Sequence, residues 1–470
     1  MIDKRQFLKG AGAAVLAALA PARVSAQSNA PRLTMPPLLD ATKTGRFALR
    51  AGAGQVSFLG SVASDTWGFN APYLGPVLRV PHQGEVQAQI ENALAEDISV
   101  HWHGLIIPGD VDGGPMQPIA PQGAWSPVLP IDQPPATIWY HSHIHERTAA
   151  HVQKGLSGVI HLVDGRDQER GLPTEYGVDD LTLVLQDRRA DPSGRVTYAP
   201  SMHDRMMGFE GDIVLVNGQF GAQAVVPRGI VRLRLLNGSN ARIFVLGMDD
   251  GRLLHLIATD SGLLDQPTSL EFLTLAPGER AEVLVDFGDG LDAALISGPS
   301  PNTGLGLAAP VMPFRVDDTL TPRITSLPTG LGGSRPDLPE SGALRREFSL
   351  DMRMGMGMMM GGGLTINGAS YDMNTVNFTA ERGQVEHWVV NGAMMMHPFH
   401  VHGVAFQVLR ENGGPPRDQN IGWKDTVLIN GQAELLMRFD HPASPALPYM
   451  YHCHILEHED GGMMGQFAVD

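Results

Sequence analysis

Short apolar segments alternate with turn residues along most of the chain, in a pattern that repeats three times. The first copy lies between Gln55 and about Asp164 and includes the segment Glu85 to Asn92. The second and third copies begin at Val214 and Leu364, and each opens with a run that ends in Asn-Gly. Apolar runs bounded by Gly, Pro or Asn-Gly predict β-strands joined by turns. We therefore expect an all-β protein with three similar domains.

Composition supports this prediction. A chain of 470 residues is long enough for about two to four domains. Its 55 glycines, 35 prolines and low fraction of charged residues favour short strands over helical bundles. The net charge of −16 predicts that the protein repels nucleic acid and anionic lipid. Cys453 is the one cysteine, which excludes an intramolecular disulfide. No motif indicates oligomerisation, and we expect a monomer.

Residues 1–26 are typical of an export signal. A basic segment that includes Lys4-Arg5 precedes the apolar run Ala11 to Ala20, and an A-x-A-like cleavage sequence ends at Ala26. The basic segment resembles the twin-arginine export motif, with lysine in place of the first arginine. The apolar run is too short to span a bilayer, and no other stretch is typical of a membrane span. We predict export to the periplasm, by the twin-arginine route or by the ordinary Sec route.

The C-terminal run from His452 to Met463 carries the strongest chemical signal. Cys453 has a histidine on each side, His458 follows five residues later, and Met463 follows ten residues later. A thiolate, two imidazoles and a weak axial thioether form the trigonal site that is typical of electron-transfer copper. The second imidazole must come from elsewhere in the chain. Met464 is an alternative axial ligand, but the ten-residue spacing favours Met463.

Three further histidine clusters supply imidazoles. They are His101-Trp-His103, His141-Ser-His143 and His397-Pro-Phe-His400-Val-His402. Side chains at i and i+2 of a strand point to the same face, so each His-x-His pair can bind one metal centre. A lone histidine is more often a surface or core residue, but ten of the 18 histidines fall in the four clusters. Imidazole and thiolate together predict copper rather than a hard cation.

The four motifs, in this order and with two near each end, resemble those of the multicopper oxidases over essentially the whole mature chain. The resemblance implies an all-β fold of three cupredoxin-like Greek-key β-sandwich domains, at residues 40–166, 175–316 and 342–470, with a linker at 317–341. The middle domain lacks His-x-His pairs and is expected to be a spacer or scaffold. The copper cluster is then expected between the first and third domains, because each contributes half of its ligands.

The resemblance also implies four copper ions, whose ligands follow from motif position. The type 1 copper would be held by His397, Cys453 and His458, with Met463 axial. The type 2 copper would be held by His101 and His400. One type 3 copper would be held by His103, His141 and His454, and the other by His143, His402 and His452. The motifs do not settle how these six histidines divide between the two type 3 ions.

Reduction of O2 to water requires protons as well as four electrons. Asp112 and Glu459 match acids that relay protons in similar oxidases, and a carboxylate near the cluster can shuttle protons. The alternatives are a turn residue for Asp112 and a solvated charge for Glu459. The neighbouring Glu457 and Asp460 are expected to be surface charges.

A methionine-rich segment is the best clue to the substrate. Thioethers favour Cu(I), and the interspersed glycines weaken regular structure. Adaptable core packing is the alternative for clustered methionine. We predict a labile substrate-copper site from Met352, Met354, Met356, Met358, Met359, Met360 and Met395. A second candidate comprises Met202, His203, Asp204, Met206 and Met207.

The sequence therefore predicts a periplasmic multicopper oxidase that couples oxidation of Cu(I) to reduction of O2, in copper tolerance. It resembles the bacterial copper-efflux oxidases, although its methionine insert is shorter and Ala393 stands where an acidic residue is expected. One alternative is a laccase-like oxidase of phenols or other small organic reductants. Another is a non-catalytic copper-binding or structural cupredoxin protein. That alternative predicts gaps among the ten histidines and the cysteine, and there are none.

Overall fold

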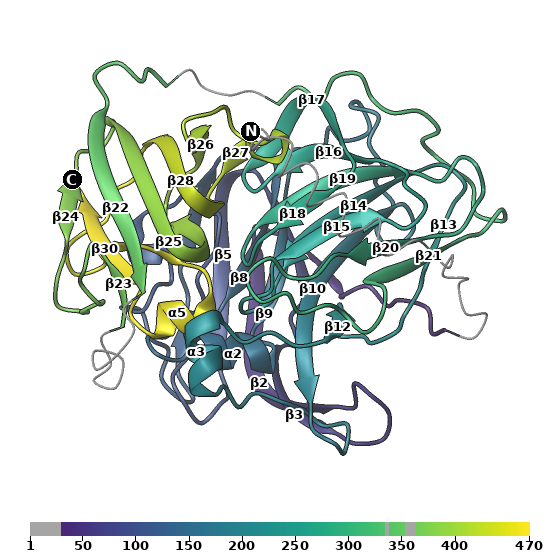
Figure 1. The fold of residues 1–470 in the computed structure, drawn as a ribbon, viewed down its shortest axis with the longest axis horizontal. Helices are drawn as coiled ribbons and strands as arrows, with labels where there is room; N and C mark the ends of the chain where they lie inside the picture. Colours follow the sequence, from purple (N-terminus) through teal and green to yellow (C-terminus); the bar gives the residue numbers. More distant parts are fainter. Residues whose placement is uncertain (1–29, 334–337, 353–362) are drawn as a thin grey trace, which may run out of the picture.

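The computed structural model describes residues 30–333, 338–352 and 363–470 (Figure 1). The predicted signal segment, residues 1–26, and Met354 to Met360 of the methionine-rich segment lie outside the described residues. Strands dominate the described chain and helices are few and short, which confirms the all-β prediction. The strands form three successive units, each with its own hydrophobic core. No helix among the described residues is both long and apolar enough for a membrane span.

The first unit consists of two sheets. One has the strand order β1-β4-β9-β8, and the other has the order β3-β2-β5-β6, with β7 also paired to β5. Side chains of β5 alternate between solvent and the core, as a strand with one buried face requires. The strands are β1 (Leu38–Asp40), β2 (Arg46–Val56), β3 (Ser64–Phe69), β4 (Val77–Pro81), β5 (Gln83–Asn92), β6 (Ala124–Trp125), β7 (Val128–Asp132), β8 (Ala136–His141) and β9 (Ser157–Val163).

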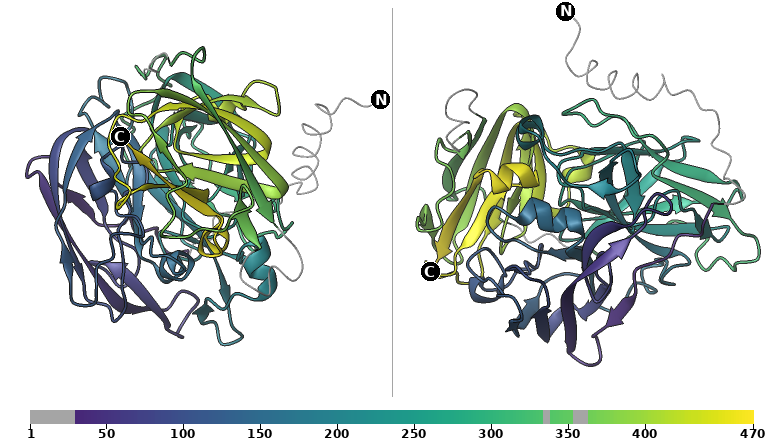
Figure 2. Two further views of the ribbon diagram at one scale, coloured as in Figure 1. Left: turned by 90° about the vertical axis from the view of Figure 1, so that its left-hand side faces the viewer. Right: turned by 90° about the horizontal axis from the view of Figure 1, so that it is seen from below.

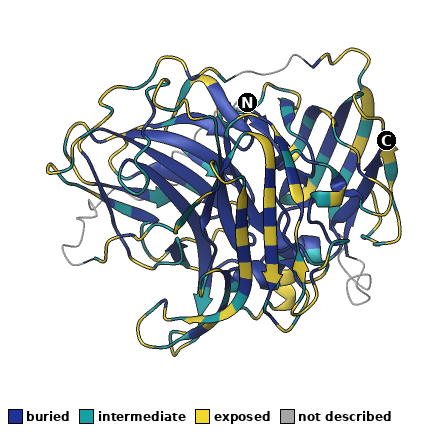
Figure 3. Ribbon diagram, turned by 180° about the vertical axis from the view of Figure 1, so that it is seen from behind, coloured by how far each residue is buried: buried dark blue, intermediate teal, exposed yellow. Residues whose placement is uncertain are grey.

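The second unit also has two sheets, with the orders β11-β10-β14-β19-β16-β17 and β13-β21-β20-β15-β18, and with β12 paired to β10. Strands β14 and β19 are buried on both faces along almost their whole length, and Figure 3 shows such buried strands through the middle of the molecule. The strands are β10 (Asp180–Ala190), β11 (Val196–Thr197), β12 (Ile213–Val216), β13 (Ala224–Val226), β14 (Ile230–Asn237), β15 (Phe244–Met248), β16 (Leu254–Thr259), β17 (Gly262–Leu270), β18 (Leu273–Leu275), β19 (Arg280–Asp286), β20 (Ala293–Ser297) and β21 (Met312–Val316).

The third unit is built around the long strand β25, which pairs with β22, β28 and β29. The register of β25 against β28 shifts between Gly392 and His397, so the residues before His397 bulge out of the ladder. The strands are β22 (Leu344–Met352), β23 (Leu364–Ile366), β24 (Phe378–Ala380), β25 (Val385–Val401), β26 (Phe406–Glu411), β27 (Trp423–Lys424), β28 (Thr426–Arg438), β29 (Tyr449–Cys453) and β30 (Met464–Val469).

Three short helices, one from each unit, lie together where the units meet (Figures 1 and 2). Ala149 and Val152 of the first helix pack on Leu456 of the last. The helices are α2 (Thr148–Lys154), α3 (Met202–Met207) and α5 (Leu456–Asp460), and two 3-10 turns are η1 (Gly109–Val111) and η2 (Asp418–Asn420). Helix α2 ends at Lys154, and the following Gly155 has a φ of 113°, a left-handed conformation that glycine adopts readily. The junction of the three units therefore contains the three α-helices of the described part of the chain.

A buried ion network joins the first and second units. Glu282 accepts hydrogen bonds from Arg232 at 2.7 Å and from Arg234 at 3.0 Å, and Thr137 of the first unit donates to it at 2.7 Å. Arg234 also binds Asp180. Burial raises the pKa of Glu282, but the two guanidinium groups outweigh it and hold the pKa below its usual value. Loss of Glu282 would therefore remove an ion-pair partner from two buried arginines, Arg232 and Arg234.

Substitution Glu282→Ala should destabilise the protein strongly, because it removes one partner of a buried ion network. We expect a loss of about 3 kcal/mol or more in the free energy of unfolding, measured from the midpoint and slope of denaturant-induced unfolding. Glu169→Ala is the matched control, because Glu169 pairs with Arg166 on the surface and such pairs contribute about 1 kcal/mol or less. Equal losses in the two variants would contradict the prediction.

Candidate metal centre

A mononuclear donor set lies at the edge of the third unit. Cys453 ends β29, His397 lies on β25, and His458 lies on α5. The Cys453 Sγ is 3.5 Å from His397 Nδ1 and 3.6 Å from His458 Nδ1, and all three side chains are buried. Met463 is buried in the same hydrophobic cluster as Cys453, and its carbonyl accepts from the Cys453 amide at 3.1 Å. Met464 begins β30 opposite His452 instead.

The protonation of these donors suits a soft metal. Burial lowers the pKa of His397 to about 4 and that of His458 to about 3, so both imidazoles are neutral at pH 7. The Nε2 of His458 donates to the Met206 carbonyl at 2.7 Å, which leaves its Nδ1 lone pair directed at the sulfur. Burial raises the pKa of the Cys453 thiol, and a bound cation would favour the thiolate.

A second donor cluster contains eight histidines, four from the first unit and four from the third. Two strand pairs bring them together. His101 lies opposite His141 in an isolated bridge, and His400 lies opposite His452 in the β25–β29 ladder. The rings of the two units then interleave: His101 stacks on His402 with centroids 3.8 Å apart. The other stacked pair across the units, His103 and His400, has centroids 3.6 Å apart.

Oxygen atoms around the cluster orient the imidazoles. The Nδ1 atoms of His101 and His400 bind the carbonyls of Asp112 and Asp425, at 3.0 and 2.8 Å. Their Nε2 atoms, like that of His141, are buried with no hydrogen-bond partner. His103 is turned the other way, with Nε2 on Asp425 and a partnerless Nδ1. Buried nitrogens without partners, directed into one space, fit metal ligation better than packing.

Three of the eight donors form a particularly tight group. The Nε2 of His452 is 3.4 Å from that of His143 and 3.3 Å from that of His402. These residues are one of the two predicted type 3 triads. The pKa values of His143 and His402 are well below their usual range, because of burial and then of repulsion from neighbouring imidazoles. Neutral rings at His143 and His402, this close to the His452 ring, are suited to share a cation with it.

Both predicted relay acids contact this cluster. Asp112 is 1% exposed, and its Oδ2 accepts from His402 Nδ1 at 2.8 Å while its Oδ1 has no partner. The carboxylate oxygens of Glu459 are 3.3 Å from His143 Nδ1 and 3.2 Å from His452 Nδ1. The two acids therefore lie beside different ligand-type histidines of the cluster.

The prediction that Glu457 is a surface charge is wrong. Glu457 is buried on α5 and accepts from Tyr198 Oη at 2.9 Å, Asn240 Nδ2 at 2.8 Å and the Phe209 amide at 3.0 Å. Burial raises its pKa to about 7, although these donors oppose the shift. Asp460 is only partly exposed and accepts from the amides of α2. The partners of Glu457 belong to the second unit and those of Asp460 to the first, so the spacing of residues along α5 does not predict them.

Sequence reasoning missed three residues that support the cluster. Asp425 accepts from His103 Nε2 at 3.0 Å and from Arg280 Nη1 at 2.8 Å, so residues of all three units meet at one carboxylate. Gly278 of the second unit lies so close to His454 that a Cβ there would be 2.9 Å from the ring. The middle unit thus positions the cluster without providing a predicted ligand. Neither Asp425 nor Arg280 stands near a histidine in the sequence, so no local motif marks them.

The described methionines have different environments. Met352 is buried in the core of the third unit, at the end of β22. Met395 of β25 and Met206 of α3 are partly buried and pack against the hydrophobic cluster that contains Cys453 and Met463. Met202 of α3 and Met394 are exposed by 60% and 68%. Two methionine-bearing segments, from different units, therefore flank the mononuclear donor set.

Comparison with known proteins identifies the class. Sequence models of the multicopper oxidase family match residues 50–167 and 343–470, the two regions that contain all of the clustered histidines. A solved laccase-like multicopper oxidase, CueO from Ochrobactrum sp., is 41% identical, with a TM-score of 0.88 over 93% of this chain and 100% of its own. This chain belongs to the multicopper oxidase family, a class of copper-binding proteins with cupredoxin-type domains.

Two further relatives differ in what they are called. Cell division protein FtsP of Dickeya dadantii is 39% identical over 100% of this chain and 98% of its own length. A Campylobacter jejuni multicopper oxidase described as a metallo-oxidase is 26% identical, with a TM-score of 0.80 over 94% of this chain and 98% of its own. The family is therefore clear, while its members include proteins named for different roles.

Substitution Asp425→Asn should weaken copper binding by the histidine cluster and spare the mononuclear site. Asp425 orients His103 and is itself held by Arg280, and loss of such a supporting group costs about 10- to 100-fold in metal affinity. Copper content after dialysis against graded chelator, together with the blue colour of the copper–thiolate site, measures the two effects. Asp440→Asn, on an exposed Asp440–Arg438 pair, is the control. Unchanged retention of copper in Asp425→Asn would contradict the prediction.

His151 should make stability depend on pH. Its Nδ1 binds Ser142 Oγ at 2.8 Å, and burial lowers its pKa to about 4 even though Glu96 opposes the shift. The unfolded chain binds a proton near pH 6.5, so stability falls as the pH decreases from about 6.5 to about 4, by up to about 3 kcal/mol. Copper-loaded His151→Gln should lose this part of the pH dependence in thermal unfolding. The exposed His203→Gln should retain it, and an identical pH profile in both variants would contradict the assignment.

Proposed function

We propose that this protein is a periplasmic multicopper oxidase that couples one-electron oxidation of Cu(I) to four-electron reduction of O2 to water. One observation carries the proposal. Cys453 belongs to the mononuclear donor set, while its neighbours His452 and His454 belong to the histidine cluster. The two donor sets are thus joined through adjacent residues of one strand end. A protein that only stored copper would not need this connection.

We infer four copper ions, one at the mononuclear set and three among the eight histidines. Bound copper would supply one-electron redox steps and a site where O2 is reduced. The chain supplies the surroundings: neutral buried imidazoles, exclusion of water, and a short covalent path from Cys453 to its two neighbours. Asp112 and Glu459 are the groups proposed to deliver protons, because each carboxylate contacts cluster histidines and retains an oxygen without a hydrogen bond.

The environment of His458 supports Cu(I) as the substrate. The His458 Nε2 donates to the Met206 carbonyl, so α3 covers the edge of this ring. Within α3, Met202 and Met206 are four residues apart, as are His203 and Met207, so each pair shares a helix face. Met395 contacts the same hydrophobic cluster from β25. Thioether and imidazole donors beside the mononuclear set favour a soft cation over a phenol.

Two alternatives follow from the relatives. The CueO relative from Ochrobactrum sp. is described as oxidising lignin model compounds, which favours organic reductants. The FtsP relatives, similar over their full length, suggest a role in cell division. The basic and apolar N-terminal segment with its A-x-A-like sequence supports export under each of these proposals.

Oxygen consumption by the copper-loaded mature protein tests the function. We expect a much higher kcat/KM with Cu(I) than with a simple phenol. Preference for the phenol would replace the proposal with a laccase-like oxidase. No uptake with either reductant, despite full copper occupancy, would favour a non-catalytic role, and cell length after deletion of the gene would then test the division hypothesis.

The double substitution Met206→Leu/Met395→Leu should reduce Cu(I) oxidation selectively. Leucine preserves the apolar packing but removes the thioether, so we expect kcat/KM for Cu(I) to fall by about tenfold, the effect of a loss of about 1.4 kcal/mol. Phenol oxidation and the blue colour should stay unchanged. Met248→Leu, in the core of the second unit, is the matched control. An equal loss with both reductants would contradict a substrate-copper role for these methionines.

A further inference from the structure

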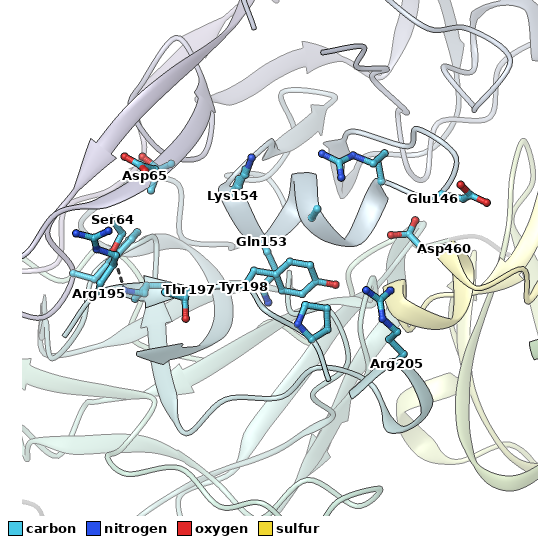
Figure 4. A pocket seen from close by; sticks show the side chains of 16 residues that line it. Ser64, Asp65, Glu146, Gln153, Lys154, Arg195, Thr197, Tyr198, Arg205 and Asp460 are labelled. Atoms are coloured by element: carbon cyan, nitrogen blue, oxygen red, sulfur yellow. Dashed lines mark hydrogen bonds between the residues drawn. The ribbon is translucent and has the colours of Figure 1, made fainter. Parts of the chain in front are cut away.

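A cavity of about 510 Å³ lies where the three units meet (Figure 4). Residues of β3 and α2 form its wall on the first unit. Residues of β11 and Arg205 of α3 form the wall on the second unit, and Asp460 of α5 lines the cavity from the third unit. None of the predicted copper ligands lines it. The volume is within the range of small-molecule sites, which is about 300 to 1,000 Å³.

Four cationic side chains line this cavity, although the whole chain has a net charge of −16. Arg147 pairs with Glu96, and the Lys154 ammonium lies 3.7 Å from the centre of the Trp67 ring. Arg195 and Arg205 are exposed, and neither side chain has a hydrogen bond or ion pair within the described part of the chain. Asp191 lies near Arg195, since the Ser193 hydroxyl and, to a smaller extent, the Arg195 charge lower the pKa of Asp191. Neither guanidinium group has an ion-pair partner among the described residues, so both are available to bind an anion.

The acidic side chains of the lining form no ion pair with these two arginines. Asp460 accepts from the amides of Thr148 and Ala149 through its two oxygens. Asp65 accepts from Gln55, and Glu146 is largely exposed beside His145. Each carboxylate is thus directed toward another partner or toward solvent. The two guanidinium groups are therefore cationic side chains of the cavity without an ion-pair partner among the described residues.

Apolar groups occupy the wall between the charges. Tyr198 lies between Arg195 and Arg205 in Figure 4, with Lys154 across the cavity. Phe58 and Pro200 add apolar surface to the lining. An inorganic ion would contact the charges but leave this surface unused. An aromatic ring can lie on it while an anionic substituent binds a guanidinium group.

We propose that the cavity binds an organic oxyanion, an aromatic ring that bears carboxylate or sulfonate groups. Arginine recognises such groups through two parallel N–H···O bonds, which are stronger than neutral hydrogen bonds. The site lies beside the loop that holds the mononuclear donors, because Tyr198 donates to Glu457 and Arg205 precedes Met206. Binding at this site does not depend on the proposed oxidase function.

Calorimetric titration of the copper-loaded mature protein tests the proposal. The probe is benzene-1,3-dicarboxylate, compared with the neutral diamide of the same shape and with inorganic phosphate. We expect the dicarboxylate to bind at least about tenfold more tightly than the other two, since the loss of one charge-assisted hydrogen bond suffices for such a difference. Binding should weaken as salt concentration increases.

The double variant Arg195→Ala/Arg205→Ala should weaken dicarboxylate binding by at least about tenfold. Arg46→Ala, an exposed arginine outside the cavity, should leave it unchanged. Lys154→Gln gives a second test with a smaller change of volume, and an unchanged melting temperature verifies folding. Absence of dicarboxylate binding, equal affinity for phosphate or for the diamide, or binding that survives the double variant would each overturn the proposal.

Discussion

The architecture of the metal centre depends on one buried carboxylate. Asp425 of the third unit accepts from His103 of the first and from Arg280 of the second, and its own carbonyl accepts from His400. Burial would raise the pKa of Asp425, but Arg280 and then His103 hold it well below its usual value, so the carboxylate is charged. A buried charge is tolerated only where its partners are in place. Asp425 can therefore orient His103 and His400 only when the three units are docked correctly.

Further charges surround this carboxylate. Lys424 lies 3.0 Å from Asp260 and 3.2 Å from Glu279, and burial raises the pKa of Asp260 to about 6 even though Lys424 and Arg280 oppose the shift. Acidic groups thus outnumber basic ones directly behind the histidine cluster. Such surroundings favour bound cations. The second unit contributes most of this support, which explains how a unit without predicted ligands still determines the properties of the cluster.

The junction of α2, α3 and α5 contains parts of the mononuclear donor set, of the histidine cluster's surroundings and of the cationic cavity. Helix α3 covers the His458 ring, α5 carries His458 and Glu459, and α2 forms one wall of the cationic cavity. Each helix comes from a different unit and is too short to be stable alone. Their packing against one another therefore requires that the three units be assembled. Access to the mononuclear donors and the shape of the cavity are consequences of that assembly.

The sequence by itself determined the fold class, the family and the group of residues suited to bind copper. Strand periodicity places His101 with His103 and His141 with His143. Cys453 is covalently joined to its histidine neighbours. Both of these relations can be predicted without knowledge of the fold. Only the tertiary structure revealed the supporting residues. His103 and Asp425 are 322 positions apart, and Arg280 and Asp425 are 145 apart. It also showed that Glu457 is buried and that Met206 covers His458. Contacts over such separations arise from the docking of the units, and the local spacing of residues along the chain does not predict them.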